Sequence, residues 1–235
     1  MSTIVIVHGA WGGSWAWRKF SRILRGNGHE VFTPTLTGLG DRSHLLTPEV
    51  GLDHHIRDVA AVLEYEDLTD IVLIGHSYGG MVVTGVADLM HDRIAELVYL
   101  DAFVPKDGDC VFDLQPAALT ERMKQLAAEQ GDGWRMPPSP LAPDTPAAER
   151  AWMEPRRKPQ PVLCFAERIK LANAPVTRRS YIYCKRIGPF DTFGPFSARA
   201  KADPAWRSYE MDASHSPHVT APEELAGVIE EIIAH

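Results

Sequence analysis

One serine of this chain lies between two glycines in the segment Gly75-His76-Ser77-Tyr78-Gly79, directly after the apolar run 71–74. A G-x-S-x-G string at the junction of a buried strand and a helix predicts a sharp turn that lifts the serine hydroxyl clear of the sheet edge. Glycines suit positions 75 and 79 because such a turn leaves little room for a Cβ atom. The chemistry open to this serine is nucleophilic attack, and Ser77 is the predicted nucleophile.

A serine hydroxyl is a weak nucleophile unless a base removes its proton, so a histidine must approach Ser77. Among the ten histidines, His215 follows the last predicted strand and precedes the predicted C-terminal helix. In an open parallel sheet this loop emerges at the carboxyl edge, where the serine is also expected. We therefore predict His215 as the base, with His218 as the reserve candidate.

The other histidines are expected to be structural or exposed. His8 and His76 adjoin glycines at strand ends and are expected to pack beneath the site. The adjacent pair His54-His55 lies on one predicted helix, where neighbouring residues do not share a face, so a metal site there is disfavoured. The histidines expected at the surface are His29, His44, His91 and His235.

The base needs a carboxylate that orients its ring, and two aspartates compete for this role. Asp101 ends the apolar strand after the nucleophile helix and so reaches the same sheet edge. Asp191 follows the next strand, but Lys185-Arg186-Ile187, directly after that strand, contains no carboxylate. An unpaired charge at the end of a buried strand is costly, which favours Asp101 as the partner of the base. Asp191 stays the alternative.

Acyl transfer also requires hydrogen-bond donors for the developing oxyanion. The backbone N–H of Tyr78, directly after the serine, is one expected donor. The second is expected from the glycine-rich loop after the first strand, where Ala10 is the predicted donor.

Strand-like and helix-like segments alternate along the chain. Several strand-like segments are continuously apolar, as a parallel sheet covered on both faces requires. The alternation predicts an α/β fold with a doubly wound, mostly parallel sheet. The predicted strands are Thr3–Val7, Glu30–Thr33, Ile71–Gly75, Leu97–Asp101, Tyr181–Cys184 and Trp206–Met211, and the predicted helices are Ser14–Leu24 (capped by Ser14 and ended by Gly26), Leu52–Leu63, Tyr78–Met90 and Pro222–Ile233.

Residues 106–175 interrupt this alternation and are predicted to form an inserted lid on a core of residues 1–105 and 176–235. Helices are expected over Leu114–Gln130 and Ala147–Met153, whereas the proline-rich segment 137–161 excludes long regular elements. Large apolar residues of the lid and the neighbouring loops are expected to line a substrate pocket. They are Trp11, Phe103, Phe112, Trp134, Met136, Trp152 and Phe165.

Composition excludes several function classes. The net charge of −7 and the lack of a basic stripe argue against nucleic-acid binding. Cys110, Cys164 and Cys184 form no C-x-x-C pair and are expected to be buried thiols. The sequence shows no signal or membrane segment. Together these features predict a cytoplasmic protein without a membrane partner. No phosphate-binding loop or metal-ligand cluster is present, so no cofactor is expected. The sequence leaves a homo-oligomer open.

The sequence resembles those of the α/β-hydrolase superfamily. More narrowly, it resembles the small cofactor-free branch that contains plant methyl esterases, hydroxynitrile lyases and bacterial pyrethroid-hydrolase-type carboxylesterases. The stretches that carry the resemblance are Val7–Trp15, Gly28-His29, Pro34–Gly40, Gly75–Met81, Tyr99–Pro105 and the run that ends at His215. The resemblance implies Ser77 as nucleophile, His215 as base, and Ala10 with Tyr78 as oxyanion donors.

Two departures from the branch affect the expected activity. The usual acid position of the branch is empty, whereas Tyr99–Phe103 is similar to superfamily members that carry the acid on the earlier strand. Hydroxynitrile lyases have a lysine after the catalytic histidine, and this chain has Ser216 there. The expected function is therefore a serine carboxylesterase for a small, hydrophobic ester. The alternatives are a non-catalytic ligand-binding or receptor protein and a hydroxynitrile lyase.

Overall fold

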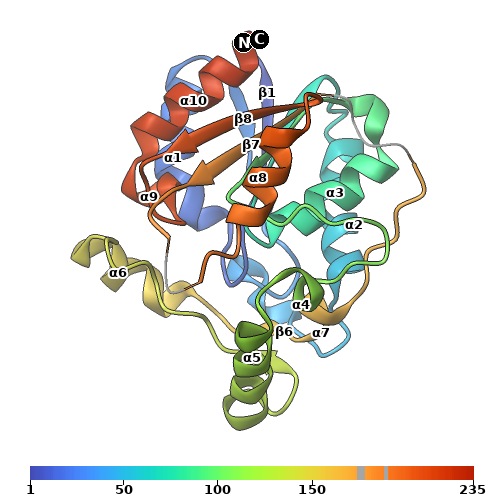
Figure 1. Ribbon diagram of the computed structural model, residues 1–235, viewed down its shortest axis with the longest axis vertical. Helices are drawn as coiled ribbons and strands as arrows, with labels where there is room; N and C mark the ends of the chain where they lie inside the picture. Colours follow the sequence, from blue (N-terminus) through green and yellow to red (C-terminus); the bar gives the residue numbers. More distant parts are fainter. Residues whose placement is uncertain (174–177, 188–189) are drawn as a thin grey trace.

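The computed structural model describes residues 1–173, 178–187 and 190–235, which form one six-stranded sheet with helices on both faces (Figure 1). Each strand pairs with its neighbours in parallel. In spatial order the strands are β2 (Glu30–Phe32), β1 (Thr3–Val7), β3 (Ile71–His76), β4 (Ile94–Leu100), β7 (Arg179–Cys184) and β8 (Trp206–Met211).

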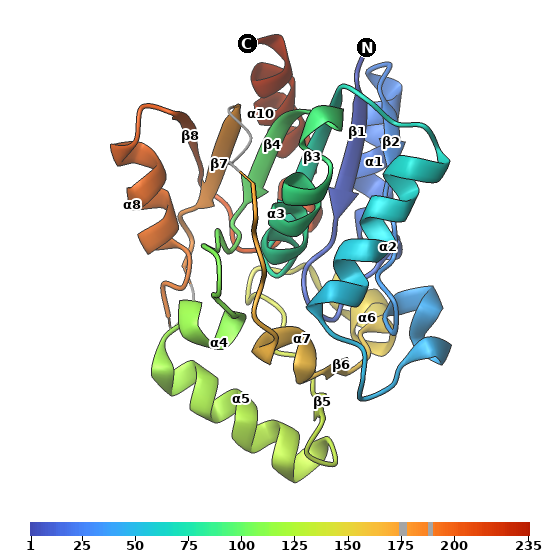
Figure 2. The ribbon, with the colours of Figure 1, turned by 90° about the vertical axis from the view of Figure 1, so that its right-hand side faces the viewer.

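The sheet has two buried faces because successive side chains of a strand point in opposite directions. Val5 and Leu73 pack into one core, whereas Ile4 and Ile74 pack into the other. Helices α2 (Leu52–Tyr65), α3 (Gly79–Leu89) and α8 (Gly194–Ala202) cover the first face, and α1 (Arg18–Gly26), α9 (Pro217–Thr220) and α10 (Pro222–Ala234) cover the second (Figures 1 and 2). The predicted doubly wound α/β fold is confirmed, although α8 was not expected.

The first helix differs from its predicted form. Residues Ser14–Trp17 form a 3-10 helix, η1, and the α-helix begins only at Arg18. The Ser14 side chain does not cap it, and its backbone N–H donates to Thr35 Oγ1 at 3.1 Å instead. The helix ends at Gly26, as predicted, and the chain leaves it through Gly28, whose φ of 90° is a left-handed conformation that glycine adopts without strain.

Residues 106–166 lie together beyond the carboxyl ends of the strands, and the chain then runs back along the molecule to residues 172 and 173, whose backbone N–H groups donate to Asp88 at the end of α3 (Figure 2). A single helix was predicted over Leu114–Gln130, but the structure has two because a proline at position 116 disfavours helical backbone at the residue before it. The segment contains α4 (Val111–Leu114), α5 (Ala117–Gln130), α6 (Ala147–Met153), α7 (Leu163–Ala166) and a small antiparallel pair of β5 (Arg135–Met136) with β6 (Gln160–Pro161). The predicted boundary at 175 and 176 lies outside the described residues.

Short 3-10 helices complete the described chain: η2 (Gly40–Leu45), η3 (His91–Arg93) and η4 (Glu154–Arg156). None of the helices that the structure describes combines the length and the apolar character needed to span a bilayer.

Two helical glycines should respond to alanine in opposite ways. A Cβ atom at Gly80, in α3, would lie 2.1 Å from the Phe103 carbonyl oxygen, and backbone cannot move aside cheaply. At Gly227, in α10, nothing lies within 4 Å of a Cβ atom. Gly80→Ala should therefore lower the free energy of unfolding by about 1–3 kcal/mol, and Gly227→Ala should raise it by about 0.5–1 kcal/mol. Urea unfolding of both variants checks this, and a stabilised Gly80→Ala protein would contradict the close contact.

Candidate active site

Ser77 occupies the sharp turn between β3 and α3 and has a φ of 55°, a left-handed conformation that is uncommon for a residue with a side chain. The turn is tight on both sides of the serine. A Cβ atom at Gly75 would lie 2.7 Å from the Gly79 carbonyl oxygen, and one at Gly79 would lie 2.5 Å from the Val7 carbonyl oxygen. Both glycines are therefore required sterically, as the sequence predicts.

Asp101 follows β4 directly and also has a left-handed φ, of 42°. Its Oδ2 atom accepts a hydrogen bond from His215 Nδ1 at 2.7 Å, and its Oδ1 atom accepts one from the backbone N–H of Cys184 at 3.2 Å. The carboxylate side chain is only 5% exposed, whereas the imidazole is 41% exposed. A ring nitrogen that donates to Asp101 leaves the opposite nitrogen, Nε2, free to accept a proton.

Asp191 lies elsewhere. It is exposed, and its Oδ1 atom accepts a hydrogen bond from the backbone N–H of Gly194 at 2.7 Å, at the start of α8. Its carboxylate thus satisfies an unpaired helix N–H group. Of the two aspartates considered, the structure brings Asp101 to His215.

His76 links the base loop to the serine turn. Its Nε2–H donates to the His215 carbonyl oxygen at 2.6 Å, and the two imidazole centroids are 4.7 Å apart. His215 is therefore held beside the residue that precedes Ser77. The other face of the His215 ring stacks on Phe193 at 4.9 Å with an interplanar angle of 6°.

His218, the reserve base, is buried and stacks on Trp17 at 4.0 Å. Burial lowers its pKa to about 3, so it is a poor proton acceptor at neutral pH. His8 and His76 are buried as predicted, and His44, His91 and His235 are exposed. The prediction that His29 lies at the surface is wrong, because this residue is only 8% exposed. It packs between the N-terminus and α10, where its ring accepts a hydrogen bond from the Ser2 N–H and contacts Glu230.

The loop after β1 approaches the serine turn closely. A Cβ atom at Gly9 would lie 2.9 Å from Ser77 Cβ, so only glycine fits there without a shift. Trp11, with a φ of 58°, fixes the loop to residues 106–173: its backbone N–H donates to Gln160 Oε1 at 2.9 Å and its indole N–H to the Met136 carbonyl oxygen at 3.0 Å.

The backbone N–H groups of Ala10 and Tyr78 donate to no acceptor within the described part of the chain. They belong to the two segments that meet at Gly9 and Ser77. Both N–H groups are therefore available to a bound oxyanion.

Three of the seven predicted pocket residues, Phe165, Trp11 and Phe112, form one aromatic cluster. Phe165 is packed by Trp11 at 5.8 Å, Tyr78 at 5.7 Å and Phe112 at 6.0 Å. Met136 is buried in the same core. Phe103 contacts Phe193, the ring that stacks on His215.

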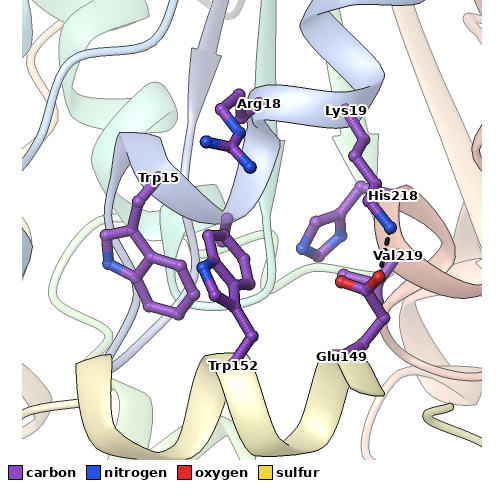
Figure 3. Close-up of a pocket in the computed structure, with 8 residues that line it drawn as sticks. Trp15, Arg18, Lys19, Glu149, Trp152, His218 and Val219 are labelled. Atoms are coloured by element: carbon purple, nitrogen blue, oxygen red, sulfur yellow. Dashed lines mark hydrogen bonds and ion pairs between the residues drawn. The ribbon is translucent and has the colours of Figure 1, made fainter. Parts of the chain in front are cut away.

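Two predicted pocket residues lie elsewhere. Trp134 is half-buried and packs under the Arg135 guanidinium. Trp152 lines a cavity of about 110 Å³ between α6 and α1, where its indole packs edge-on against Trp15 at 5.3 Å (Figure 3). Lys19 and Glu149 form an ion pair at this cavity. Trp152 therefore belongs to the junction of α6 with the core.

Sequence reasoning missed His55, which is fully buried in α2 between the Thr37 carbonyl oxygen and the Tyr78 hydroxyl. The signal was available. Position 55 falls on the apolar stripe of the helix with Leu52, Ile56, Val59 and Leu63, which a surface histidine does not do. No group of three or more side chains among the described residues is arranged to hold a metal ion.

The contacts of the two aspartates predict different effects of mutation. Asp101→Asn should lower the kcat for ester hydrolysis by about three to four orders of magnitude, because an amide at this position can favour the wrong histidine tautomer. Asp191→Asn should change kcat by less than about tenfold, because that side chain only caps α8. Steady-state kinetics of both variants test the ranking, and the reverse order would reject Asp101.

The buried histidines predict that the fold loses stability in acid. Burial lowers the pKa values of His8 and His55 to about 4 and that of His218 to about 3. In the unfolded chain these groups titrate near 6.5, so below that pH the unfolded state binds more protons. Their contribution to stability is thus fully present above about pH 6.5 and is lost as the pH falls toward 4, at up to about 1.4 kcal/mol per pH unit for each group.

Urea unfolding at pH 7.5, 6.5 and 5.5 measures this loss. His218→Phe preserves an aromatic ring against Trp17 but removes one titrating group, so its stability should fall less steeply with pH than that of the unmodified protein. Parallel pH profiles for the two proteins would show that His218 is not buried in its neutral form.

Comparison with known proteins shows to which protein family the chain is related. The model of the Alpha/beta hydrolase family matches residues 4–228. A carbendazim hydrolyzing esterase of Nocardioides sp. (strain SG-4G) is 39% identical over 236 residues, which cover 96% of this chain and 97% of the relative. A pyrethroid hydrolase of Sphingobium wenxiniae is 33% identical over 110 residues, 46% of this chain and 38% of the relative.

A similar fold is found among solved structures. An extracellular alpha/beta-hydrolase from a Paenibacillus species superposes with a TM-score of 0.85 at 27% identity, over 99% of each chain. The relatives confirm the predicted class of carboxylic ester hydrolase. Because the family model and the esterase both span nearly the whole sequence, the chain belongs to the alpha/beta hydrolase family.

Proposed function

We propose that this chain is a serine carboxylesterase that uses Ser77 as nucleophile, His215 as general base and Asp101 as the carboxylate that orients the base. The observation that carries the proposal is the 2.7 Å hydrogen bond between His215 Nδ1 and Asp101 Oδ2, formed beside a serine in a strained strand-to-helix turn. The strain supports a functional role, since left-handed backbone at a serine is maintained only where the surroundings impose it.

The reaction has two halves. His215 Nε2 takes the hydroxyl proton as Ser77 Oγ bonds to the ester carbonyl carbon, and the imidazolium is stabilised by Asp101. His215 then returns the proton to the leaving alkoxide oxygen, so that an alcohol departs and an acyl group remains on Ser77. In the second half His215 takes a proton from water, the resulting hydroxide attacks the acyl carbon, and the proton returns to Ser77 Oγ as the acid leaves.

The oxyanion of each tetrahedral intermediate is bound by the backbone N–H groups of Ala10 and Tyr78. Their lack of other acceptors in the described chain supports this role. Donors fixed in place before the reaction stabilise the developing charge without reorganisation, which is a large part of catalysis in such sites.

The substrate is a hydrophobic ester enclosed by the described residues 106–173, which act as a lid. The aromatic cluster of Trp11, Phe112 and Phe165 supports an apolar pocket, and its contact with Tyr78 places it beside the proposed nucleophile. The names of the relatives, which specify carbendazim and pyrethroids, support a small-molecule substrate.

A cytoplasmic location is part of the proposal, because the three cysteines are buried free thiols, as is usual in a reducing compartment. Hydroxynitrile cleavage is disfavoured by Ser216, which stands where lyases have a lysine. The remaining rival is a ligand-binding protein without catalysis on the same scaffold.

Release of nitrophenol from short-chain nitrophenyl esters tests the function. Ser77→Ala should lower kcat by about four to six orders of magnitude. A fluorophosphonate should attach its phosphonyl group to the serine of the unmodified protein, with loss of fluoride, but should not label Ser77→Ala. The control variant Ser43→Ala, in η2, should keep both activity and labelling. A protein that neither turns over these esters nor reacts with the phosphonate would support the ligand-binding alternative.

A further inference from the structure

His55 makes two hydrogen bonds inside the core and has no solvent exposure. Its Nε2 atom lies 2.9 Å from the Thr37 carbonyl oxygen, and its Nδ1 atom lies 2.9 Å from the Tyr78 hydroxyl. The ring thus connects the loop after β2 to the residue that directly follows Ser77.

The proton positions in this network follow from the partners. A carbonyl oxygen only accepts, so the proton of the neutral imidazole is on Nε2. Nδ1 is then an acceptor, and the Tyr78 hydroxyl donates to it. Burial favours this arrangement, because it lowers the pKa of His55 to about 4 and raises the pKa of Tyr78 well above its ordinary value. The Tyr78 hydroxyl therefore has one fixed direction at neutral pH.

The far end of the network is also fixed. Thr37 donates from its backbone N–H to Asp58 Oδ2 at 2.6 Å and from its hydroxyl to Asp58 Oδ1 at 2.8 Å. Asp58 is one turn after His55 on α2 and is paired with Arg42 at 3.0 Å. Thr37 is thus held by two side chains of one helix, and the carbonyl oxygen that orients His55 cannot easily move.

The other end of the network is Tyr78, whose backbone N–H group is one of the two proposed oxyanion donors. Tyr78 is 1% exposed and lies at the start of α3, with its ring edge-on to His55 and against Phe165. A ring held at its hydroxyl by His55 and packed against Phe165 limits rotation of the peptide that precedes Tyr78. That peptide carries the N–H group for which we propose oxyanion binding.

We propose that His55 is a positioning residue for the oxyanion site: by accepting a hydrogen bond from the Tyr78 hydroxyl it fixes the direction of the Tyr78 backbone N–H. The inference rests on the proposed function of Ser77 and Tyr78. In this role His55 and the Tyr78 hydroxyl stabilise the transition state through the position of the Tyr78 backbone N–H, without contacting the substrate themselves.

Tyr78→Phe removes only the hydroxyl and leaves the ring in place. We expect kcat for nitrophenyl esters to fall by about tenfold, less than the 10²–10³-fold cost of deleting an oxyanion donor, with KM changed by less than about twofold. Affinity for a trifluoromethyl ketone, whose adduct with serine carries the oxyanion, should fall by the same factor as kcat/KM.

Two substitutions of His55 separate positioning from packing. Asn places its Oδ1 atom where His has Nδ1, so His55→Asn keeps the acceptor for Tyr78 and should stay within about threefold of the unmodified kcat, whereas His55→Leu should match the loss in Tyr78→Phe. The double variant His55→Leu/Tyr78→Phe should lose no more than either single variant, because both remove the same hydrogen bond.

Tyr99→Phe is the matched control. Tyr99 is as buried as Tyr78, and its hydroxyl bonds to Thr84 at 2.8 Å, so that it takes no part in the His55–Tyr78 hydrogen bond. This variant should lose a similar amount of thermal stability with kcat unchanged. Equal kcat in Tyr78→Phe and Tyr99→Phe, additive losses in the double variant, or full activity of His55→Leu would each overturn the proposal. If the unmodified protein hydrolyses no ester and resists the phosphonate, the proposed function itself has failed.

Discussion

Left-handed backbone at three neighbouring loops is the constraint on which the site depends. Trp11, Ser77 and Asp101 follow the adjacent strands β1, β3 and β4, and their φ angles are 58°, 55° and 42°. Such a conformation costs a residue with a side chain about 1–2 kcal/mol. Backbone hydrogen bonds hold it in place, from Ser77 N–H to the Leu100 carbonyl and from Asp101 N–H to the Ile182 carbonyl. Packing of the sheet thus maintains the strain that aims these side chains beyond its edge.

The proposed lid and the proposed oxyanion loop are not independent parts. Trp11 donates its two N–H groups to Gln160 and Met136, both from the small β5–β6 pair. A change in the position of that pair therefore moves the loop that carries Ala10. The hydrogen bonds of Trp11 thus attach the proposed oxyanion loop to the proposed lid.

Neutral histidines give the site fixed hydrogen-bond directions. His8 accepts from the Leu36 N–H, and His55 donates to the Thr37 carbonyl, so two adjacent residues of one loop orient both rings. A protonated imidazole cannot accept a hydrogen bond, and burial keeps these rings neutral. The same burial makes the fold sensitive to acid. The feature that fixes the hydrogen-bond directions of the site therefore also lowers the stability of the fold at low pH.

The sequence alone determined the fold class, the turn at Ser77 and the loop that carries His215. These features are local, because periodicity, glycine spacing and order along the chain specify which residues reach the carboxyl edge of a parallel sheet. It also favoured Asp101, because an aspartate at the end of a buried strand needs a partner. Only the tertiary structure decided that Asp101 bonds to His215 while Asp191 caps α8, that Trp152 leaves the aromatic cluster, and that His29 and His55 are buried. Apart from the local contact of Asp191 with Gly194, these outcomes depend on contacts between residues 18 or more positions apart in the sequence, and local patterns carry no distance information at that separation.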